Sequence, residues 1–487
     1  MNFLAFDLGA ESGRAVIGRF DGQRLGLEEV HRFPNGPVRI LDGLHWDVLR
    51  LFEEMKRGIA LGVRQAGRDL AGIGLDTWGV DFALLDRAGA LLGNPYHYRD
   101  SRTDGMLEEA FRLVPKRDIF AATGVQFLKL NTLYQVLAMS VQRSPLLDAA
   151  ETLLMIPDLF NYWLTGRKAC EFTDATTTQF YDPARRDWSR ALFERLSLPA
   201  RILPEVVPPG TPLGPLLGPV ADETGARDVT VIAPACHDTG SAVAAVPASG
   251  EDYAYISSGT WSLMGAEVRE PILTDAALNH NFTNEGGVEG TFRFLKNIMG
   301  LWLVQECRRA WEREGDALSY DDLTRLASEA PAFGPVVDPD DDRFVGIGDM
   351  PGRIRAFCEE TGQVPPAGRG AVVRCALEGL ALKYRHVLER LEEILKRRLG
   401  AVHVVGGGSR NRLLCQLTAD ATGRPVIAGP AEATAIGNIL IQALATGHLG
   451  ALSDARAVVR RSFDVVTYEP RRDDRWDEAY ARFLKMT

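Results

Sequence analysis

A strand–turn–strand pattern occurs twice in this sequence, half a chain apart, and it limits the folds that are open to the chain. An apolar run at residues 3–6 leads into a small polar turn around Gly9, and a second apolar run begins just after Arg14. The same order of runs returns at residues 253–264, where the turn contains Gly259. The two glycines are 250 positions apart in a chain of 487 residues. The sequence therefore predicts two related halves, each opening with a β-hairpin.

Helical and strand patterns alternate in both halves. Asp47 is placed to cap a helix whose apolar face includes Leu51 and Ile59, and residues 371–398 are typical of a long, partly buried helix. Short apolar strands are predicted at residues 72–75, 229–233 and 402–405. The fold class is therefore α/β, with two domains of duplicated origin.

The domain boundary is predicted near the middle of the chain. Residues 204–219 are crowded with Pro and Gly and are interpreted as a surface loop, whereas the crossing between domains is expected near residues 246–251. This gives an N-terminal domain at 1–245 and a C-terminal domain at 246–487.

Charge and cysteine usage exclude several classes of function. The 55 Lys and Arg residues against 65 Asp and Glu give a net charge of -10, which disfavours binding to nucleic acid or to an anionic membrane. No apolar run approaches the roughly 20 residues of a membrane span. The six cysteines lack CxxC spacing, which argues against zinc and redox motifs. We expect a cytoplasmic protein with a small-molecule substrate, and the oligomeric state is left open between monomer and weak dimer.

The first polar turn, Gly9 to Gly13, is a candidate phosphate site. Backbone N–H groups in a turn of small residues suit phosphate oxygens. Asp7 precedes the turn and is a candidate for holding Mg²⁺ through water, and Arg14 follows it and could meet a transferred phosphoryl charge. A plain hairpin turn is the alternative, and the local sequence favours neither interpretation.

Two further turns have similar chemistry. Residues 257–260 offer two hydroxyl-bearing neighbours around Gly259, and residues 406–409 are a Gly-rich run between a strand and a helix. The Gly-rich run at residues 406–409 lets the backbone approach a nucleotide closely. Neither GxGxxG after the first strand nor a P-loop is present at these turns, so we reject a dinucleotide fold and a Walker site.

A carboxylate lies where an α/β protein commonly binds ligands. The strand at 229–233 ends shortly before His237, Asp238 and Thr239, which open a predicted helix. Asp238 could accept the proton of a hydroxyl that attacks a terminal phosphate. Its alternative role is a helix N-cap, and a lone histidine such as His237 is more often packed or hydrogen-bonded than a ligand.

The segment 76–81 is a candidate sugar-binding element. Trp78 would offer an apolar face to a sugar ring, Gly79 would allow close backbone approach, and Asp81 adds a carboxylate. Packing of a buried tryptophan is the commoner explanation for a single Trp.

Taken together, these segments resemble the FGGY carbohydrate kinases along essentially the whole chain. The segments that carry the resemblance are DLGAESGR (7–14), GLDTWGVDF (74–82), YRDSRT (98–103), FTDATTTQ (172–179), HDTGSAV (237–243), YISSGTWSLMG (255–265), TNEGGVEG (283–290), KNIMGLWLVQ (296–305) and VVGGGSRN (404–411). The resemblance implies two actin-like, ribonuclease-H-like domains of duplicated origin flanking a catalytic cleft.

The resemblance also implies roles for individual residues, with Asp238 as the general base. The residues implied for the nucleotide are Ala10, Glu11, Ser12, Gly13, Arg14, Thr260, Gln305 and Gly407. The residues implied for the sugar are Gly79, His237, Asp238, Thr239 and Asn297. Glu11 stands where the family often has a small hydroxyl residue, so its backbone role is expected and its side-chain role is left open.

The implied reaction is phosphorylation of a ketose at its C1 hydroxyl by ATP, with Mg²⁺ as cofactor. L-Rhamnulose is the substrate that the resemblance implies. Glycerol and xylulose kinases carry Arg or His about where Val80 stands here, which argues against those two substrates. Another deoxy-ketose such as L-fuculose is the alternative. A non-catalytic sugar sensor on the same fold is the rival from another class, and the presence of both Asp7 and Asp238 argues against it.

Overall fold

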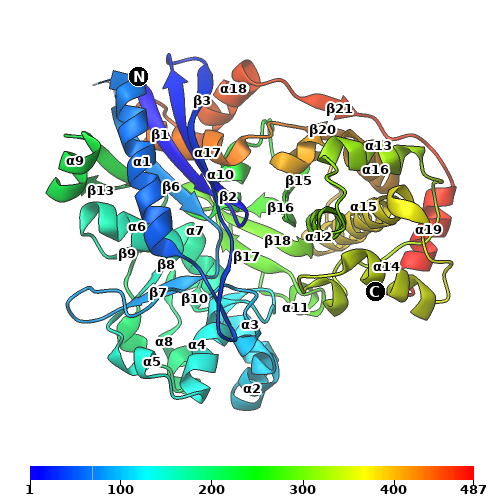
Figure 1. Ribbon diagram of the computed structural model, residues 1–487, viewed down its shortest axis with the longest axis horizontal. Coiled ribbons are helices and arrows are strands. Elements are labelled where there is room, and N and C mark those ends of the chain that lie inside the picture. The colour runs from blue at the N-terminus through cyan, green and yellow to red at the C-terminus, as the bar shows by residue number, and fades with distance from the viewer. Residues whose placement is uncertain (68–69) are drawn as a thin grey trace. The chain divides into compact units, whose positions relative to one another are not determined.

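The computed structural model describes residues 1–67 and 70–487 and divides into two compact α/β units. Unit 1 contains Met1–Ser249, Glu267–Phe294 and Ala433–Ser462, and unit 2 contains Gly250–Ala266, Leu295–Glu432 and Phe463–Thr487. Figure 1 shows both, coloured along the chain. Two later segments of the chain thus complete the unit that the first 249 residues begin.

A six-stranded sheet forms the centre of unit 1. Its order is β13-β14-β6-β1-β2-β3, where the strands are β1 (Asn2–Leu8), β2 (Ser12–Phe20), β3 (Leu25–Pro34), β6 (Leu70–Thr77), β13 (Thr211–Pro215) and β14 (Thr230–Ala233). Strands β1, β2 and β3 pair antiparallel, and β6 pairs parallel with both β1 and β14. The carboxyl ends of β1 and β6 therefore lie side by side.

Helices α1 (Val48–Ala66) and α17 (Ala433–Ala445) cover opposite faces of this sheet (Figure 1). The predicted cap is present, because the Asp47 side chain accepts a hydrogen bond from the Arg50 N–H. A Cβ on Gly58 of α1 would lie 2.7 Å from the Phe6 ring, and one on Gly74 of β6 would lie 2.3 Å from Oδ1 of Asn438 in α17. Glycine at these positions lets both helices approach the strands closely.

The remaining helices of unit 1 are shorter than α1 and α17. Its other helices are α2 (Met106–Leu113), α3 (Lys116–Thr123), α4 (Thr132–Val141), α5 (Pro145–Ala149), α6 (Ile156–Thr165), α7 (Phe172–Ala175), α8 (Arg190–Arg195), α9 (Gly218–Thr224), α10 (Asp238–Ala244), α11 (Asp275–Asn279) and α18 (Leu452–Ser462). Its other strands are β4 (Val38–Ile40), β5 (Gly43–His45), β7 (Phe82–Leu85), β8 (Thr152–Met155), β9 (Ala169–Glu171), β10 (Tyr181–Asp182), β11 (Asp187–Trp188), β12 (Glu205–Val207) and β17 (Thr283–Gly286).

The sheet of unit 2 repeats the strand plan of unit 1. The strands that lie wholly or mainly in unit 2 have the order β18-β16-β15-β19-β20-β21. They are β15 (Tyr253–Ser258), β16 (Trp261–Val268), β18 (Phe292–Met299), β19 (Ala401–Val405), β20 (Val426–Ala428) and β21 (Val466–Tyr468). An antiparallel hairpin again precedes two parallel neighbours and an antiparallel edge strand. The shared plan supports the predicted duplication.

Six helices accompany the second sheet. They are α12 (Trp302–Arg313), α13 (Tyr320–Glu329), α14 (Met350–Glu360), α15 (Gly368–Leu395), α16 (Arg412–Thr422) and α19 (Arg475–Phe483). The long helix α15 begins and ends three residues earlier than the predicted 371–398 and packs against α13 and α16. The helix prediction is therefore confirmed with a small shift.

The prediction of a loop at residues 204–219 is wrong. This segment contains β12 and β13, and α9 begins at Gly218. Pro212 and Pro215 lie in β13, which is the edge strand of its sheet. An edge strand tolerates proline because one side of it has no ladder partner, so the proline content did not signal a loop here.

All six cysteines are free thiols with buried side chains. In the described part of the chain, no helix is both long enough and apolar enough to cross a membrane.

Candidate active site

The first hairpin ends in a charged pair. Asp7 is directly opposite Arg14 in the β1–β2 register, and Arg14 Nη2 lies 2.6 Å from Asp7 Oδ2. The turn between them is fixed from outside, since the Asn35 side chain donates to the Gly9 carbonyl at 2.7 Å and the Asn35 N–H donates to the Glu11 carbonyl at 2.9 Å. Ala10, Ser12 and Gly13 complete this turn, so the five residues implied for the nucleotide in unit 1 are consecutive on one bend.

A buried acid stands beside this pair. Asp76 on β6 is in register with Asp7, is fully buried, and accepts a 2.6 Å hydrogen bond from Asn438 Nδ2 of α17. Burial, and then the nearby charge of Asp7, raise the pKa of Asp76 well above its usual range. Burial therefore favours the neutral form of Asp76 beside Asp7.

Asp238 lies at the start of α10, and His237 takes the N-cap position. Its side chain keeps about 30% exposure, and its Oδ1 accepts from the Thr239 N–H and, at 3.2 Å, from the Thr239 hydroxyl. Within the described residues, Oδ2 has no protein donor. Burial raises the pKa of Asp238, while the neighbouring His237 opposes that rise. One carboxylate oxygen is thus held in place and the other is open to a ligand.

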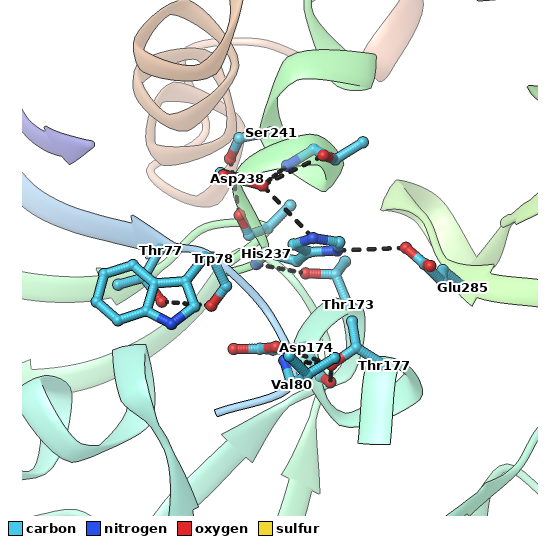
Figure 2. A network of polar contacts seen from close by, with 12 residues as sticks. Thr77, Trp78, Val80, Thr173, Asp174, Thr177, His237, Asp238, Ser241 and Glu285 are labelled. Carbon is cyan, nitrogen blue, oxygen red and sulfur yellow. Dashed lines mark hydrogen bonds and ion pairs between the residues drawn. The ribbon is translucent and has the colours of Figure 1, made fainter. Parts of the chain in front are cut away.

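His237 lies between Asp238 and Glu285, as Figure 2 shows. Its Nε2 is 3.4 Å from Asp238 Oδ1, and its Nδ1 is 3.3 Å from Glu285 Oε2. Arg293 Nη2 is 3.1 Å from the same Nδ1 and 3.2 Å from Glu285 Oε2. His237 Nδ1 therefore has both a donor, Arg293, and an acceptor, Glu285, within 3.3 Å, while Nε2 faces Asp238.

The strand tip that carries His237 is fixed by a buried carboxylate. Glu171 Oε2 accepts from the Cys236 N–H at 2.8 Å and from the Thr173 hydroxyl, and Thr173 Oγ1 in turn accepts from the His237 N–H at 3.1 Å. Burial raises the pKa of Glu171 to about 7. The position of Asp238 therefore depends on a network that reaches back to β9.

The segment 77–81 lies next to this strand tip. The Thr77 N–H donates to the Cys236 carbonyl at 2.8 Å, and Thr77 forms a parallel bridge with His237. A Cβ on Gly79 would lie 3.0 Å from Thr177 Cγ2, so the glycine permits this close approach. Asp81 is fully buried, and Trp78 Nε1 donates to its Oδ2 at 3.0 Å.

In unit 2, the second hairpin has no charged pair. Ser257 is opposite Leu263, and the turn is closed by a 2.8 Å bond from the Gly259 N–H to the Trp261 carbonyl. The Thr260 carbonyl accepts from the Gly300 and Trp302 N–H groups, which fixes the turn against the start of α12.

Two other predicted residues of unit 2 lie on the elements that follow this turn. Gln305 lies on α12, and its buried Oε1 has no hydrogen-bond partner among the described residues. Asn297 lies on β18 and is half-buried.

The Gly-rich run of unit 2 packs against the second hairpin. A Cβ on Gly408 would lie 2.0 Å from Ser258 Oγ, and Gly406 has a φ of +82° with Ser258 O 2.9 Å from its Cβ position. Gly407, by contrast, is exposed with no atom within 4 Å of its Cβ position. The flanking glycines are thus required by packing, and Gly407 leaves backbone open to a ligand.

The predicted residues therefore form two groups. Unit 1 holds Asp7, residues 10–14, Trp78, Gly79, Asp81 and residues 237–239, and unit 2 holds Thr260, Asn297, Gln305 and Gly407. No cluster of three or more His, Cys, Asp or Glu side chains suited to a metal is found in the described ranges.

Sequence reasoning gave no role to Glu171, Glu285 or Arg293, and it indicated Asp76 only as part of the candidate sugar-binding segment 76–81. The segments FTDATTTQ and TNEGGVEG lie beside or contain two of them, and an acid in such a segment was the one available signal.

The fold is that of sugar kinases of known structure. A xylulose kinase from Lactobacillus acidophilus superimposes with a TM-score of 0.81 at 15% sequence identity, covering 100% of this chain and 96% of the other. At that identity the likeness defines the fold alone.

Sequence comparison identifies the family. The profile of the FGGY family of carbohydrate kinases, N-terminal domain, matches residues 2–245, and that of the C-terminal domain matches 254–446. A rhamnulokinase from Bacteroides thetaiotaomicron is 44% identical over 482 residues, covering 99% of this chain and 98% of the relative. A rhamnulokinase from Oceanobacillus iheyensis is 43% identical over 465 residues, covering 96% and 97%. The chain belongs to the FGGY family of carbohydrate kinases.

Proposed function

We propose that this protein transfers the terminal phosphoryl group of ATP to the C1 hydroxyl of L-rhamnulose, which gives L-rhamnulose 1-phosphate and ADP. The observation that carries the proposal is the group of relatives named rhamnulokinase, which are 40–44% identical over nearly the full length of the chain. The reaction belongs to the degradation of L-rhamnose, and we place it in the cytoplasm. We also propose 1–245 and 246–487 as the two family domains.

Asp238 is the proton acceptor in this proposal. Its Oδ1 is held by Thr239 while Oδ2 faces no protein donor within the described residues, so Oδ2 is the oxygen that takes the C1 hydroxyl proton. His237 holds the carboxylate from the Oδ1 side. Phosphoryl transfer requires mainly positioning and neutralisation of charge, so one well-placed carboxylate is sufficient.

The remaining sugar contacts are assigned to residues of both units. Gly79, His237 and Thr239 contribute from unit 1 and Asn297 from unit 2, with Trp78 as the apolar face of the sugar site. Trp78 is fixed by its hydrogen bond to Asp81, so Asp81 acts on the sugar through Trp78.

The nucleotide is assigned to turns with open backbone. In unit 1 the bend from Ala10 to Arg14 meets the phosphates, with Glu11 contributing its backbone. In unit 2 Thr260, Gln305 and Gly407 contact the nucleotide, and the open Cβ position of Gly407 supports this assignment.

The donors at the end of β1 fit a magnesium ion that keeps most of its water. Mg²⁺ in kinases is usually held by one or two carboxylates together with water and phosphate oxygens. Asp7 meets this need, since Arg14 occupies its Oδ2 and its Oδ1 makes no protein hydrogen bond within the described residues. When bound, Mg²⁺ would neutralise charge on the phosphates.

A substrate panel tests the proposal. Purified protein with ATP and Mg²⁺ is assayed for ADP release with L-rhamnulose, L-fuculose, L-xylulose and D-xylulose, and the product is identified by ³¹P NMR. We expect the highest kcat/KM for L-rhamnulose and a 1-phosphate product. Higher kcat/KM for L-fuculose would move the assignment to that sugar, and no sugar-dependent ADP release would overturn it.

A further inference from the structure

The turn next to Asp238 is held in an unusual backbone conformation. Val80 has a φ of +67°, and the Asp81 N–H donates to the Gly79 carbonyl at 2.9 Å across it. A γ-turn with positive φ at a β-branched residue is strained, and such strain persists only where the surroundings enforce it. Both polar groups of Val80 are held, since its N–H donates to Thr177 Oγ1 at 3.1 Å and its carbonyl accepts from Thr132 Oγ1 at 2.7 Å.

A single buried carboxylate fixes the residues on both sides of this turn. Asp81 Oδ2 accepts from the indole nitrogens of Trp46 at 2.6 Å and Trp78 at 3.0 Å, and from the Tyr98 N–H at 3.2 Å. The two indole rings lie 3.9 Å apart, centroid to centroid. Asp81 Oδ1 accepts from Gln135 Nε2 at 2.9 Å. All of these partners are donors, so the arrangement requires Asp81 to be an acceptor at both oxygens.

Arg102 sets the direction of this chain of hydrogen bonds. Its Nη2 donates to Gln135 Oε1 at 2.6 Å. Because a guanidinium never accepts, the Gln135 oxygen must face Arg102, and its nitrogen must face Asp81 and the carbonyls of Val80 and Leu130. A reversed amide would point its oxygen at three acceptors, so Arg102 excludes that orientation.

The same arginine supplies the charge that balances the carboxylate. Its side chain is stacked over the Tyr96 ring at 3.8 Å, and within the described residues Gln135 is its only protein acceptor. The other ionisable groups nearby are Asp100, which caps the short helix that contains Arg102, and His97, whose pKa is lowered to about 3 by burial and which is therefore neutral. Burial raises the pKa of Asp81 to about 6, and the hydrogen bonds and the Arg102 charge limit that rise.

We propose that Arg102 and Gln135 are positioning residues for the sugar. They keep Asp81 ionised and acceptor-only, and through it they hold Trp78 and the Val80 turn in the shape that receives the substrate beside Asp238. This inference rests on the proposed function for its kinetic consequence, whereas its structural consequence can be measured without any sugar.

Protonation of Asp81 would break this arrangement of hydrogen bonds. A proton on Oδ1 would meet the Gln135 donor, and a proton on Oδ2 would displace an indole N–H. The amide can turn to accept that proton only by giving up Arg102 and the Val80 carbonyl. Protonation, or loss of Arg102, therefore releases the strained turn while leaving Asp238 and the nucleotide residues intact.

The kinetic test uses Arg102→Met, with Arg112→Met as a matched control on the exposed helix α2, where Arg112 pairs with Glu109. We expect Arg102→Met to raise the KM for the sugar about tenfold, as for loss of a charge-assisted hydrogen bond, with kcat and the KM for ATP nearly unchanged. Arg102→Lys should recover part of the loss. A loss shared equally between kcat and both KM values, or an equal effect of Arg112→Met, would overturn the proposal.

The second test follows the indole N–H resonances of Trp46 and Trp78 by ¹⁵N NMR as a function of pH, without sugar. In the wild type both should titrate together near pH 6, the pKa of Asp81. Arg102→Met should move that midpoint up by about one pH unit, and Asp81→Asn should abolish it. An unmoved midpoint in Arg102→Met would refute the inference even if the kinase proposal holds. A wild type that titrates as expected but phosphorylates no sugar would refute the proposed function alone.

Discussion

The hairpins that open the two units share a backbone plan and differ in their side chains. Asp7 and Ser257 are equivalent positions, because each precedes the turn glycine of its hairpin by two residues. Their neighbours on the adjacent strands differ. Asp7 faces Arg14 on the antiparallel side and Asp76 on the parallel side, whereas Ser257 faces Leu263 and Val405. The duplicated bend carries fixed charge in unit 1 and exposes neutral backbone and small residues in unit 2.

This difference suggests a division of roles after duplication. Charged groups suit the reacting phosphoryl group and its metal ion, and open backbone suits the rest of a nucleotide. We therefore assign the chemistry to unit 1, together with Asp238, and much of the nucleotide binding to unit 2.

The largest effect is expected at Asp238. Asp238→Asn keeps the shape of the side chain and removes the proton acceptor, so kcat should fall by about 10²–10⁴-fold, with little change in melting temperature. Asp222→Asn, at an exposed carboxylate of α9, is the matched control. Steady-state kinetics with saturating L-rhamnulose decides this, and near-normal turnover of Asp238→Asn would remove the assigned base.

Substitutions at equivalent positions of the two hairpins test whether the hairpins differ in role. Asp7→Ala should lower kcat by about 10²-fold, because it removes the carboxylate that balances Arg14 and that is assigned to Mg²⁺. Ser257→Ala, at the equivalent position of unit 2, should cost less than about threefold. Activity measured across a Mg²⁺ titration should separate them, and equal losses would show that the two bends do not differ in role.

The Gly-rich run of unit 2 should be sensitive to packing at one glycine and insensitive at the next. Gly408→Ala would place a methyl group 2.0 Å from Ser258 Oγ, and we expect the free energy of unfolding to fall by about 1–3 kcal/mol. Gly407→Ala has open space and should stay within about 0.5 kcal/mol of the wild type, while its KM for ATP rises. Denaturant unfolding measures the free energy of unfolding of both variants, and steady-state kinetics measures the KM for ATP. Equal stability of the two variants would contradict the packing argument.

Glu171, the buried acid that fixes the strand tip before Asp238, should make the stability of unit 1 depend on pH. Burial raises the pKa of Glu171 from 4.5 to about 7, so the folded state binds the proton more tightly than the unfolded state. The stability from this group is fully present below pH 4.5 and is lost as pH rises through 7. Between pH 5 and 7 the loss should be about 2 kcal/mol, and Glu171→Gln should remove it. Hydrogen exchange of the backbone amides in β14 and α10, followed as a function of pH, measures this loss of stability. The same pH dependence in the wild type and in Glu171→Gln would contradict the role of Glu171 in this network.

Much of the fold could be predicted because its signals are local. The two hairpins, the helix capped by Asp47 and the long α15 follow from periodicity and capping. The return of residues 433–462 to unit 1 could not be predicted, since it depends on packing such as that of Asn438 against Asp76. The strands within 204–219 were missed because proline on an edge strand looks like proline in a loop.

The candidate site also combines residues that the sequence reveals with residues that only the structure reveals. Asp238 and the polar turns are visible in the sequence because each lies at a strand end or in a run of small residues. Glu285, Arg293 and Glu171 support His237 and Cys236 from distant parts of the chain, and no spacing rule connects them. The role of Asp81 was also hidden, since only the structure shows that four donors surround it.

The division of roles is tested most directly by the affinity of Asp238→Asn for ADP, measured by isothermal titration calorimetry beside the wild type. If Asp238 serves the sugar hydroxyl and not the nucleotide, the Kd for ADP should agree with the wild type within about twofold while turnover is lost. A Kd that weakens in proportion to the loss of turnover would place Asp238 in the nucleotide site and contradict the account.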